Sequence, residues 1–393
     1  MKSRIPYGKQ SITEEDIQAV VDVLRSDFWT QGPEVPKFEQ NFAQYVGAEY
    51  AVAVANGTAA LHLCTLALNV KPGDEVITSP ITFVASANCV AYCGGEVVFA
   101  DIDRETYLLD INAVRKVLEA DTERKIKGII PVDFAGRVVD FEAFRALADE
   151  FDCWLIEDAC HSPGGSFINA AGNTIKAGSG TYADLAIFSF HPVKHIAAGE
   201  GGMITTNNVE LYNHLLKLRT HGITKNLQDF QNSVELSGGK TDFPLWYMEM
   251  QHLGFNYRIT DILAALGNSQ LGRADDGILK RREIAGRYND AFCSITKIKT
   301  FANKGIENHA FHLYIIEVPN REQLYLKLRE NNILAQVHYF PAHLMPYYRE
   351  KGWKQGDFPC AEDYYEGCIS LPMYATLRRE EQEKIIEIIL TFY

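Results

Sequence analysis

A lysine stands between an apolar run and a glycine-rich turn in the stretch AIFSFHPVKHIAAGEGGM, residues 186–203. The apolar run predicts a buried strand, and the glycines predict a tight bend after it. A lysine that is partly desolvated has a lowered pKa, and its neutral amine can form a covalent bond with a carbonyl group. A solvated surface lysine is the alternative for Lys194. Ser189, at the end of the apolar run, could bind an anion.

Three further groups follow apolar runs directly, and ligands of α/β sheets bind at the carboxyl ends of strands. Asp158 follows CWLIE and could bind a protonated ring nitrogen, or it could cap a helix or form an ion pair. Asn56-Gly57-Thr58 follows YAVAVA and precedes a helical segment, where free N–H groups could bind phosphate or form an ordinary turn. Phe83 follows EVITSPI and could stack on a flat ligand or fill the core.

Together these groups predict a site for a planar, phosphorylated ring that carries an aldehyde. Pyridoxal 5′-phosphate (PLP) fits that description, because it binds to a lysine amine and requires an acidic partner for its ring nitrogen. The acid keeps the nitrogen protonated, so that the ring can accept electrons when a Cα–H bond breaks. The lysine, once released, is placed to move that proton. The groups are Gly57, Thr58 and Ser189 for the phosphate, Asp158 for the ring nitrogen, Phe83 for one ring face and Lys194 for the aldehyde.

Helical and strand segments alternate over the first 210 residues, and they must position these groups. SITEEDIQAVVDVL predicts a helix with Thr13 as its N-cap, and VPKFEQNFAQYVG predicts a helix that ends at Gly47. Between the helical segments lie short apolar runs that are typical of buried strands. This alternation predicts an α/β domain with a mostly parallel sheet. The strand runs are YAVAVAN, EVITSP, EVVFADID, GIIPVDF, CWLIEDA, DLAIFSF and GGMITTN.

The pattern changes after about residue 220. Residues 225–251 are polar and irregular, which predicts a long loop. A helical stretch follows, and the remaining segments to the C-terminus predict a smaller α+β domain. We therefore expect a large domain over residues 1–255 and a small domain over residues 256–393.

The net charge of −13 argues against binding to nucleic acid or to an anionic membrane surface. The N-terminal segment has no apolar core of a signal peptide, and no apolar run is long enough to span a bilayer, so we expect a cytoplasmic protein. The eight cysteines form no CxxC pair, which favours buried thiols over a metal site. SGGKT (237–241) resembles the end of a P-loop, but Val234 stands where its first glycine belongs and no strand precedes it.

The chain resembles the DegT/DnrJ/EryC1/StrS family of sugar aminotransferases nearly end to end. The resemblance implies the fold type I architecture of aspartate aminotransferase, with PLP as cofactor. Family members that dehydrate at C3 carry a histidine where this chain has Lys194, so the resemblance favours transamination. The segments that carry it include VAVANGTAALHL, ITSPITFVASAN, IEDACHSPG, FSFHPVKHIAAGEGG and HLGFNYRITDILAALGNSQL.

The resemblance also implies roles for individual residues. Lys194 would anchor PLP covalently, Asp158 would bind the pyridine nitrogen, and His161 would lie near the ring hydroxyl. Asn256, in GFNYR, matches a family asparagine that reaches the cofactor phosphate of the partner subunit, which implies a homodimer with shared active sites. Candidates for substrate contact are Tyr7, Thr30, Arg258, His312, His338 and Tyr339.

Within the family, PVDFAGR, ILAQVHYFPAH and AEDYYEGCISLPM are most similar to enzymes of pseudaminic acid biosynthesis. Those enzymes move the amino group of L-glutamate to C4 of a UDP-linked 4-keto-6-deoxy-N-acetylhexosamine. The alternative is another 3- or 4-keto sugar on a UDP, dTDP or GDP carrier. A regulator that has the same fold without turnover is disfavoured, because Lys194 and Asp158 are intact. Residues 225–251 could cover the nucleotide sugar or form a variable surface loop.

Overall fold

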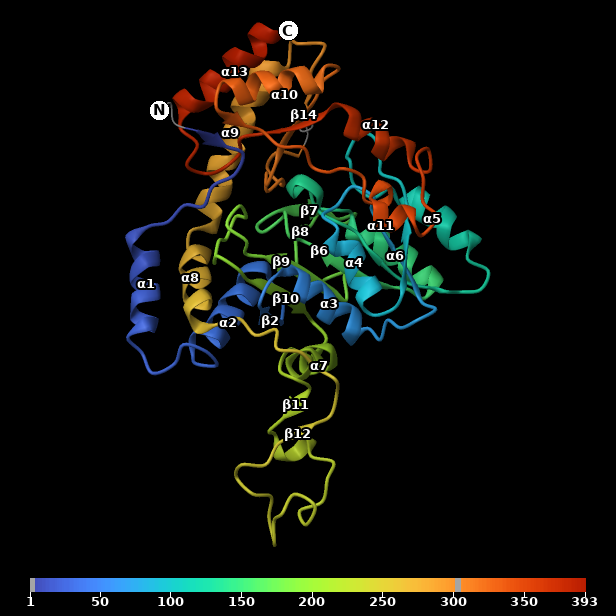
Figure 1. Ribbon diagram of the computed structural model, residues 1–393, viewed down its shortest axis with the longest axis vertical. Coiled ribbons are helices and arrows are strands. Elements are labelled where there is room, and N and C mark those ends of the chain that lie inside the picture. Colours follow the sequence, from blue (N-terminus) through green and yellow to red (C-terminus); the bar gives the residue numbers. More distant parts are fainter. Residues whose placement is uncertain (1–3, 301–304) are drawn as a thin grey trace.

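A seven-stranded sheet forms the centre of the protein in the computed structural model, which describes residues 4–300 and 305–393 (Figure 1). Among these strands β10 runs antiparallel to both of its neighbours, and the other pairings are parallel. The predicted α/β fold with a mostly parallel sheet is therefore confirmed. In sheet order the strands are β2 (Tyr50–Val54), β10 (Gly202–Thr206), β9 (Leu185–Ser189), β6 (Trp154–Asp158), β5 (Ile126–Ile130), β3 (Glu75–Thr78) and β4 (Glu96–Phe99).

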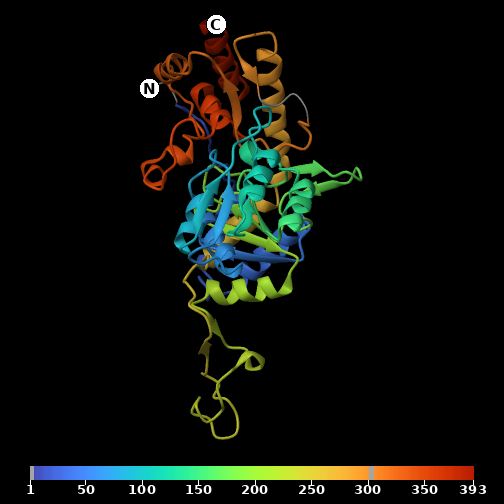
Figure 2. The same ribbon diagram turned by 90° about the vertical axis from the view of Figure 1, so that its right-hand side faces the viewer.

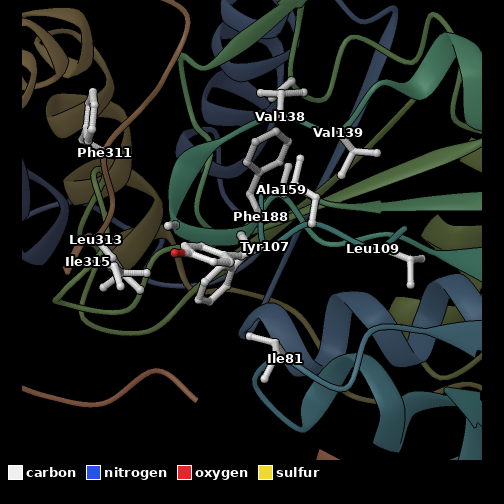
Figure 3. Packing of buried hydrophobic residues seen from close by; sticks show 14 of the residues in the cluster. Ile81, Tyr107, Leu109, Val138, Val139, Ala159, Phe188, Phe311, Leu313 and Ile315 are labelled. Atoms are coloured by element: carbon white, nitrogen blue, oxygen red, sulfur yellow. The ribbon is translucent and has the colours of Figure 1, made fainter. Parts of the chain in front are cut away.

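Helices cover both faces of this sheet, so successive strand residues enter two different cores. In β2, Val52 and Val54 pack in the core beneath α3, α4 and α7, whereas Ala51 and Ala53 pack in the core of the opposite face. This second core also contains Phe311 of the C-terminal part; Figure 3 shows a portion of it. The helices are α1 (Glu14–Leu24), α2 (Glu34–Val46), α3 (Gly57–Ala67), α4 (Ala85–Tyr92), α5 (Ile111–Ala120), α6 (Phe141–Phe151), α7 (Val209–Arg219) and α8 (Asp261–Leu271).

The first two helices begin and end where the sequence predicts. Thr13 is the N-cap of α1, and Gly47 ends α2 in the left-handed region with a φ of 86°. Part of the apolar surface of α1 is nevertheless not covered by its own chain, since Ile17 and Leu24 are 48% and 46% exposed, whereas Val23 is buried. The two exposed side chains are thus available to a partner.

A smaller α+β unit follows, as predicted from the sequence. Its antiparallel sheet has the order β13-β14-β16, and β15 pairs in parallel with the N-terminal strand β1. The predicted domain boundary at residue 255 stays a prediction. The elements are β1 (Ile5–Pro6), α9 (Ala274–Phe292), β13 (Lys299–Thr300), β14 (Tyr314–Glu317), α10 (Arg321–Glu330), β15 (Ile333–Leu334), α11 (Pro346–Arg349), α12 (Pro359–Gly367), β16 (Cys368–Leu371) and α13 (Arg379–Phe392).

Residues 223–253 form an arm that projects away from the rest of the molecule beyond α7 (Figures 1 and 2). Short strands β11 (Ile223–Thr224) and β12 (Glu249–Met250) pair at its base. The Glu249 carboxylate accepts hydrogen bonds from two backbone N–H groups of the arm, and three aromatic rings, Phe230, Phe243 and Tyr247, pack together. The predicted loop is thus an internally bonded arm. Across the described ranges, no helix is long and apolar enough to cross a bilayer.

Candidate active site

A cavity of about 730 Å³ opens where the carboxyl ends of the parallel strands meet the start of α3. Most of the residues singled out from the sequence line it, although they come from segments far apart in the chain. Thr30, Asn256 and Arg258 do not line the cavity of their own chain. The predicted residues that line it are Tyr7, Gly57, Thr58, Phe83, Asp158, His161, Ser189, Lys194, His312, His338 and Tyr339.

Lys194 is held in the turn that follows β9. Its backbone N–H donates to the carbonyl of His191 at 2.8 Å, and Ala198 N–H returns to the carbonyl of Phe190 at 2.9 Å. Burial lowers the pKa of the Lys194 amine below its ordinary value, while the nearby Cys160 and Asp158 act in the opposite direction. The neutral amine is therefore favoured relative to a lysine in water. His195 faces away from this turn, because its Nε2 lies 2.9 Å from the carbonyl of Ala310.

Asp158 lies at the end of β6 and is 5% exposed. Its Oδ2 accepts a hydrogen bond from Ser86 Oγ at 2.6 Å, and its Oδ1 accepts from the backbone N–H of Cys160 at 3.2 Å. Ser86 is in turn 2.8 Å from the hydroxyl of Thr82. No Lys, Arg or His of the described chain forms an ion pair with this carboxylate. Asp158 is thus a fixed, buried acceptor with room for a cationic partner in the cavity.

The start of α3 provides anion-binding groups. Asn56 caps the helix, since its side chain accepts from Ala59 N–H at 2.8 Å and its carbonyl from Ala60 N–H at 3.1 Å. The N–H groups of Gly57 and Thr58 find no acceptor among the described residues. A Cβ at Gly57 would lie 3.0 Å from Cβ of Ser189, so glycine allows this close approach. Two free N–H groups and a hydroxyl therefore converge, as a phosphate group requires.

Several histidines and tyrosines also line the cavity. His161 is 4% exposed, and burial, with the nearby Lys194, holds the pKa of its imidazole well below the ordinary value. His312 packs against it with a ring-centroid distance of 4.3 Å. His338 Nδ1 lies 2.9 Å from the hydroxyl of Ser370. His312 Nδ1 is buried and has no hydrogen-bond partner within the described residues.

Phe83 is 59% exposed beside the cavity and is therefore not a core residue. Sequence reasoning did not identify Ser86, which donates to Asp158, or Thr82, which contacts Ser86. Their signal is weak, since a Thr and a Ser spaced by four residues are common in helices. It also did not identify His62 and Tyr257, whose Nδ1 and hydroxyl lie 3.2 Å apart at the cavity wall.

Comparisons with known proteins agree with this geometry. The sequence model of the DegT/DnrJ/EryC1/StrS aminotransferase family matches residues 10–390. SpsC, a spore coat polysaccharide biosynthesis protein of Bacillus subtilis, is 38% identical over 392 residues, which are 98% of this chain and 95% of that protein. Among solved structures, Spr1654 of Streptococcus pneumoniae in its PMP form has a TM-score of 0.87 at 30% identity and covers 98% of each chain. PseC of Helicobacter pylori, an aminotransferase of pseudaminic acid biosynthesis, has a TM-score of 0.86 at 29% identity and covers 99% of each chain.

Proposed function

The chain belongs to the DegT/DnrJ/EryC1/StrS aminotransferase family, and we propose that it transfers the amino group of L-glutamate to C4 of a UDP-linked 4-keto-6-deoxy-N-acetylhexosamine. As a member it is a PLP-dependent sugar aminotransferase of fold type I. The observation that carries the proposal is the single cavity that brings Lys194, the acceptor Asp158 and the free N–H groups of α3 together.

The donor set of this cavity fits PLP. When bound, PLP supplies an aldehyde that carries amino groups and a ring that accepts electrons from a breaking C–H bond. We expect Lys194 to hold the aldehyde, and Gly57, Thr58 and Ser189 to hold the phosphate. Asp158 would accept a hydrogen bond from the ring nitrogen and keep it protonated.

The remaining residues orient groups and move protons. The free Lys194 amine would accept the proton from Cα of glutamate. In the second half-reaction the same amine delivers a proton to C4 of the sugar. His161 is neutral, so it would lie near the ring hydroxyl without adding a charge. Phe83 would cover one ring face.

A second copy of the chain is expected to complete the site. Among the cavity-lining residues of the described chain, Lys194 is the one Lys or Arg, although the cofactor, glutamate and the nucleotide sugar are all anionic. Asn256 is exposed, whereas its neighbour Tyr257 lines the cavity. This orientation supports the proposal that Asn256, with Arg258, serves the cavity of the partner. The exposed apolar side chains of α1 support a homodimer too.

The arm also supports contact between subunits. Leu245 and Trp246 of the arm are 104% and 83% exposed, which is costly for large apolar groups in a monomer. We propose that the arm covers the nucleotide sugar in the dimer. The double variant Leu245→Ser/Trp246→Ser would then raise the KM for the sugar at least severalfold and leave the KM for glutamate unchanged. Equal KM values for both substrates in the variant and the parent would identify a surface loop instead.

The sugar is the open choice within this function. The likeness to PseC, of pseudaminic acid biosynthesis, supports a UDP-linked 4-keto-6-deoxy-N-acetylhexosamine. The likeness to SpsC, of spore coat polysaccharide biosynthesis, leaves another keto nucleotide sugar as the alternative. Incubation with L-glutamate and a panel of 3-keto and 4-keto nucleotide sugars, read by product mass, separates these. We expect the highest kcat/KM for the UDP-linked 4-keto sugar, with 2-oxoglutarate formed in equal amount. A higher value for another sugar would establish the alternative.

A further inference from the structure

Two residues next to Asp158, Glu157 in the chain and Asp133 across the sheet, carry buried carboxyl groups. Asp133 follows β5 and is 0% exposed, and Glu157 precedes Asp158 in β6 and is 4% exposed. The two side chains are in hydrogen-bond contact with each other. No Lys, Arg or His in the described ranges forms an ion pair with either of them. Two carboxylates in contact, buried and without a cation, cannot both stay ionised, so one proton must lie between them.

The hydrogen-bond donors indicate which member carries the proton. Asp133 Oδ1 accepts from Val139 N–H at 2.9 Å, and Oδ2 accepts from Ser162 Oγ at 2.5 Å. Glu157 has a single donor, the N–H of Gly178, at 3.0 and 3.1 Å from its two oxygens. The better-supplied Asp133 is therefore the ionised member, and Glu157 is protonated and donates to it.

The pKa values of both groups agree with this assignment. Burial raises the pKa of Asp133 to about 7 and raises the pKa of Glu157 well above its ordinary value. The nearby charge of Asp158 also raises the pKa of both carboxyls.

Asp133 connects this pair to the active site along two routes. Its backbone N–H donates to the carbonyl of Asp158 at 3.1 Å. Its carboxylate holds Ser162, the residue after His161. Both residues that would flank the cofactor ring are thus tied to Asp133, Asp158 through the backbone N–H and His161 through the carboxylate and Ser162.

We propose that Asp133 and Glu157 share one proton and that this pair positions Asp158 and His161. The positioning of the ring rests on the proposed function, whereas the shared proton does not. Asp133 and Glu157 are positioning residues, since neither lines the cavity.

Two nearly isosteric variants separate the members of the pair. Glu157→Gln retains a neutral donor toward Asp133 and an acceptor for Gly178, so we expect the Kd for PLP to change by less than about twofold. Asp133→Asn removes the anion that holds Ser162, so we expect the Kd for PLP to rise about tenfold or more. Equal effects of the two variants would contradict the assignment of the proton to Glu157.

Infrared spectroscopy of the full-length protein detects the proton directly. A buried protonated carboxyl group gives a carbonyl band that is distinct from the carboxylate bands and shifts in D₂O. We expect this band at neutral pH in the parent protein, with and without PLP, and its loss in Glu157→Gln. A parent spectrum that does not change in Glu157→Gln would overturn the shared proton, whatever sugar the enzyme aminates.

The pH dependence of unfolding gives an independent readout. Because burial raises the pKa of Glu157 in the folded state, that state keeps a proton at pH values where the unfolded chain has already lost it. The free energy of unfolding therefore falls as pH rises. The unfolding equilibrium constant should increase by up to about tenfold for each pH unit. This slope should be smaller in Glu157→Gln, and an unchanged slope would contradict the proposal.

Ser162→Ala keeps the test valid where Asp133→Asn does not fold. It removes one of the two donors to Asp133, so we expect severalfold weaker PLP binding and a shifted infrared band. Thr78→Val is the matched control, since its hydroxyl is equally buried and donates at 2.8 Å to the carbonyl of Ile130 in β5, away from either carboxyl. If Ser162→Ala and Thr78→Val lose the same PLP affinity and the infrared carbonyl band does not shift, the proposed role of the Asp133–Glu157 pair is contradicted.

Discussion

The hydroxyl of Tyr339 lies 3.3 Å from Nε2 of His161, on the cavity side of that ring. The backbone N–H of Ala135 approaches Nδ1 of the same ring, also at 3.3 Å. A backbone N–H can only donate, so Nδ1 must be the acceptor and Nε2 must carry the proton. The main chain thus fixes the tautomer of His161, and the Nε2–H group of this ring donates to the Tyr339 hydroxyl.

Nitrogen NMR of labelled histidine tests this assignment. Burial holds the pKa of His161 well below its ordinary value, so we expect the ring to stay neutral, with its proton on Nε2, at pH 6. Tyr339→Phe should shift the Nε2 resonance and leave Nδ1 nearly unchanged. A charged imidazolium at pH 6, or a proton on Nδ1, would show that the assignment is wrong.

Ser86→Ala should weaken PLP binding through Asp158. The 2.6 Å hydrogen bond from Ser86 is donated to a buried carboxylate, and such bonds contribute about 1.5–3 kcal/mol. We expect the Kd for PLP to rise about tenfold or more and kcat to fall. Thr82→Val is the control, because Thr82 contacts Ser86 and not the carboxylate, and its effect should be smaller. If Ser86→Ala binds PLP as tightly as the parent protein, Ser86 does not support PLP binding through Asp158.

The lowered pKa of Lys194 is expected to show in the cofactor-free protein. Labelling of amines with fluorodinitrobenzene, followed by peptide mass spectrometry, gives the rate for Lys194 as a function of pH. We expect a midpoint below the 10.5 of an ordinary lysine, because burial favours the neutral amine. The exposed Lys240 of the arm reports reagent reactivity in the same digest. A midpoint at or above 10.5 would contradict a desolvated amine.

The same shift predicts the sign of a stability effect. The folded state releases the Lys194 proton at lower pH than the unfolded chain does. The free energy of unfolding should therefore rise with pH between the folded pKa and about 10.5, relative to Lys194→Met.

Shared active sites predict complementation between two inactive variants. In a mixed dimer of Lys194→Ala and Asn256→Ala chains, one site combines the intact Lys194 of one chain with the intact Asn256 of the other. With random exchange of subunits in a two-fold dimer, about a quarter of all sites should regain activity. Sites built from one chain would regain none. A mixture of Lys194→Ala with Asp158→Asn is the control, since both positions line the cavity of their own chain and no intact site can form.

The alternation of helices and strands was sufficient to predict the α/β fold, because strands such as β9 are apolar on both faces. The residues after those strands could be placed in one site for the same reason, since the carboxyl ends of parallel strands meet. Asp158 and Lys194 belong to this class.

Other parts of the site could not be predicted from local patterns. Ser86 and Asp158 are 72 positions apart in the chain, and the sequence around either residue does not indicate the hydrogen bond between them. In the sequence, Asp133 belongs to a turn after a strand and Glu157 to an apolar run. The pairing of β5 with β6 brings the two residues together. The apolar residues of α1 have the spacing of a helix that packs on a core. The sequence alone does not show that Ile17 and Leu24 stay exposed in their own chain.

Covalent mapping of PLP tests the central claim, that this cavity holds the amine on which amino transfer depends. The purified protein with PLP is reduced with borohydride, digested and analysed by mass spectrometry. The account predicts a phosphopyridoxyl group on Lys194, and loss of both the label and the visible absorbance of bound PLP in Lys194→Ala. A label on a different lysine, or a protein that retains the absorbance in Lys194→Ala, would contradict it.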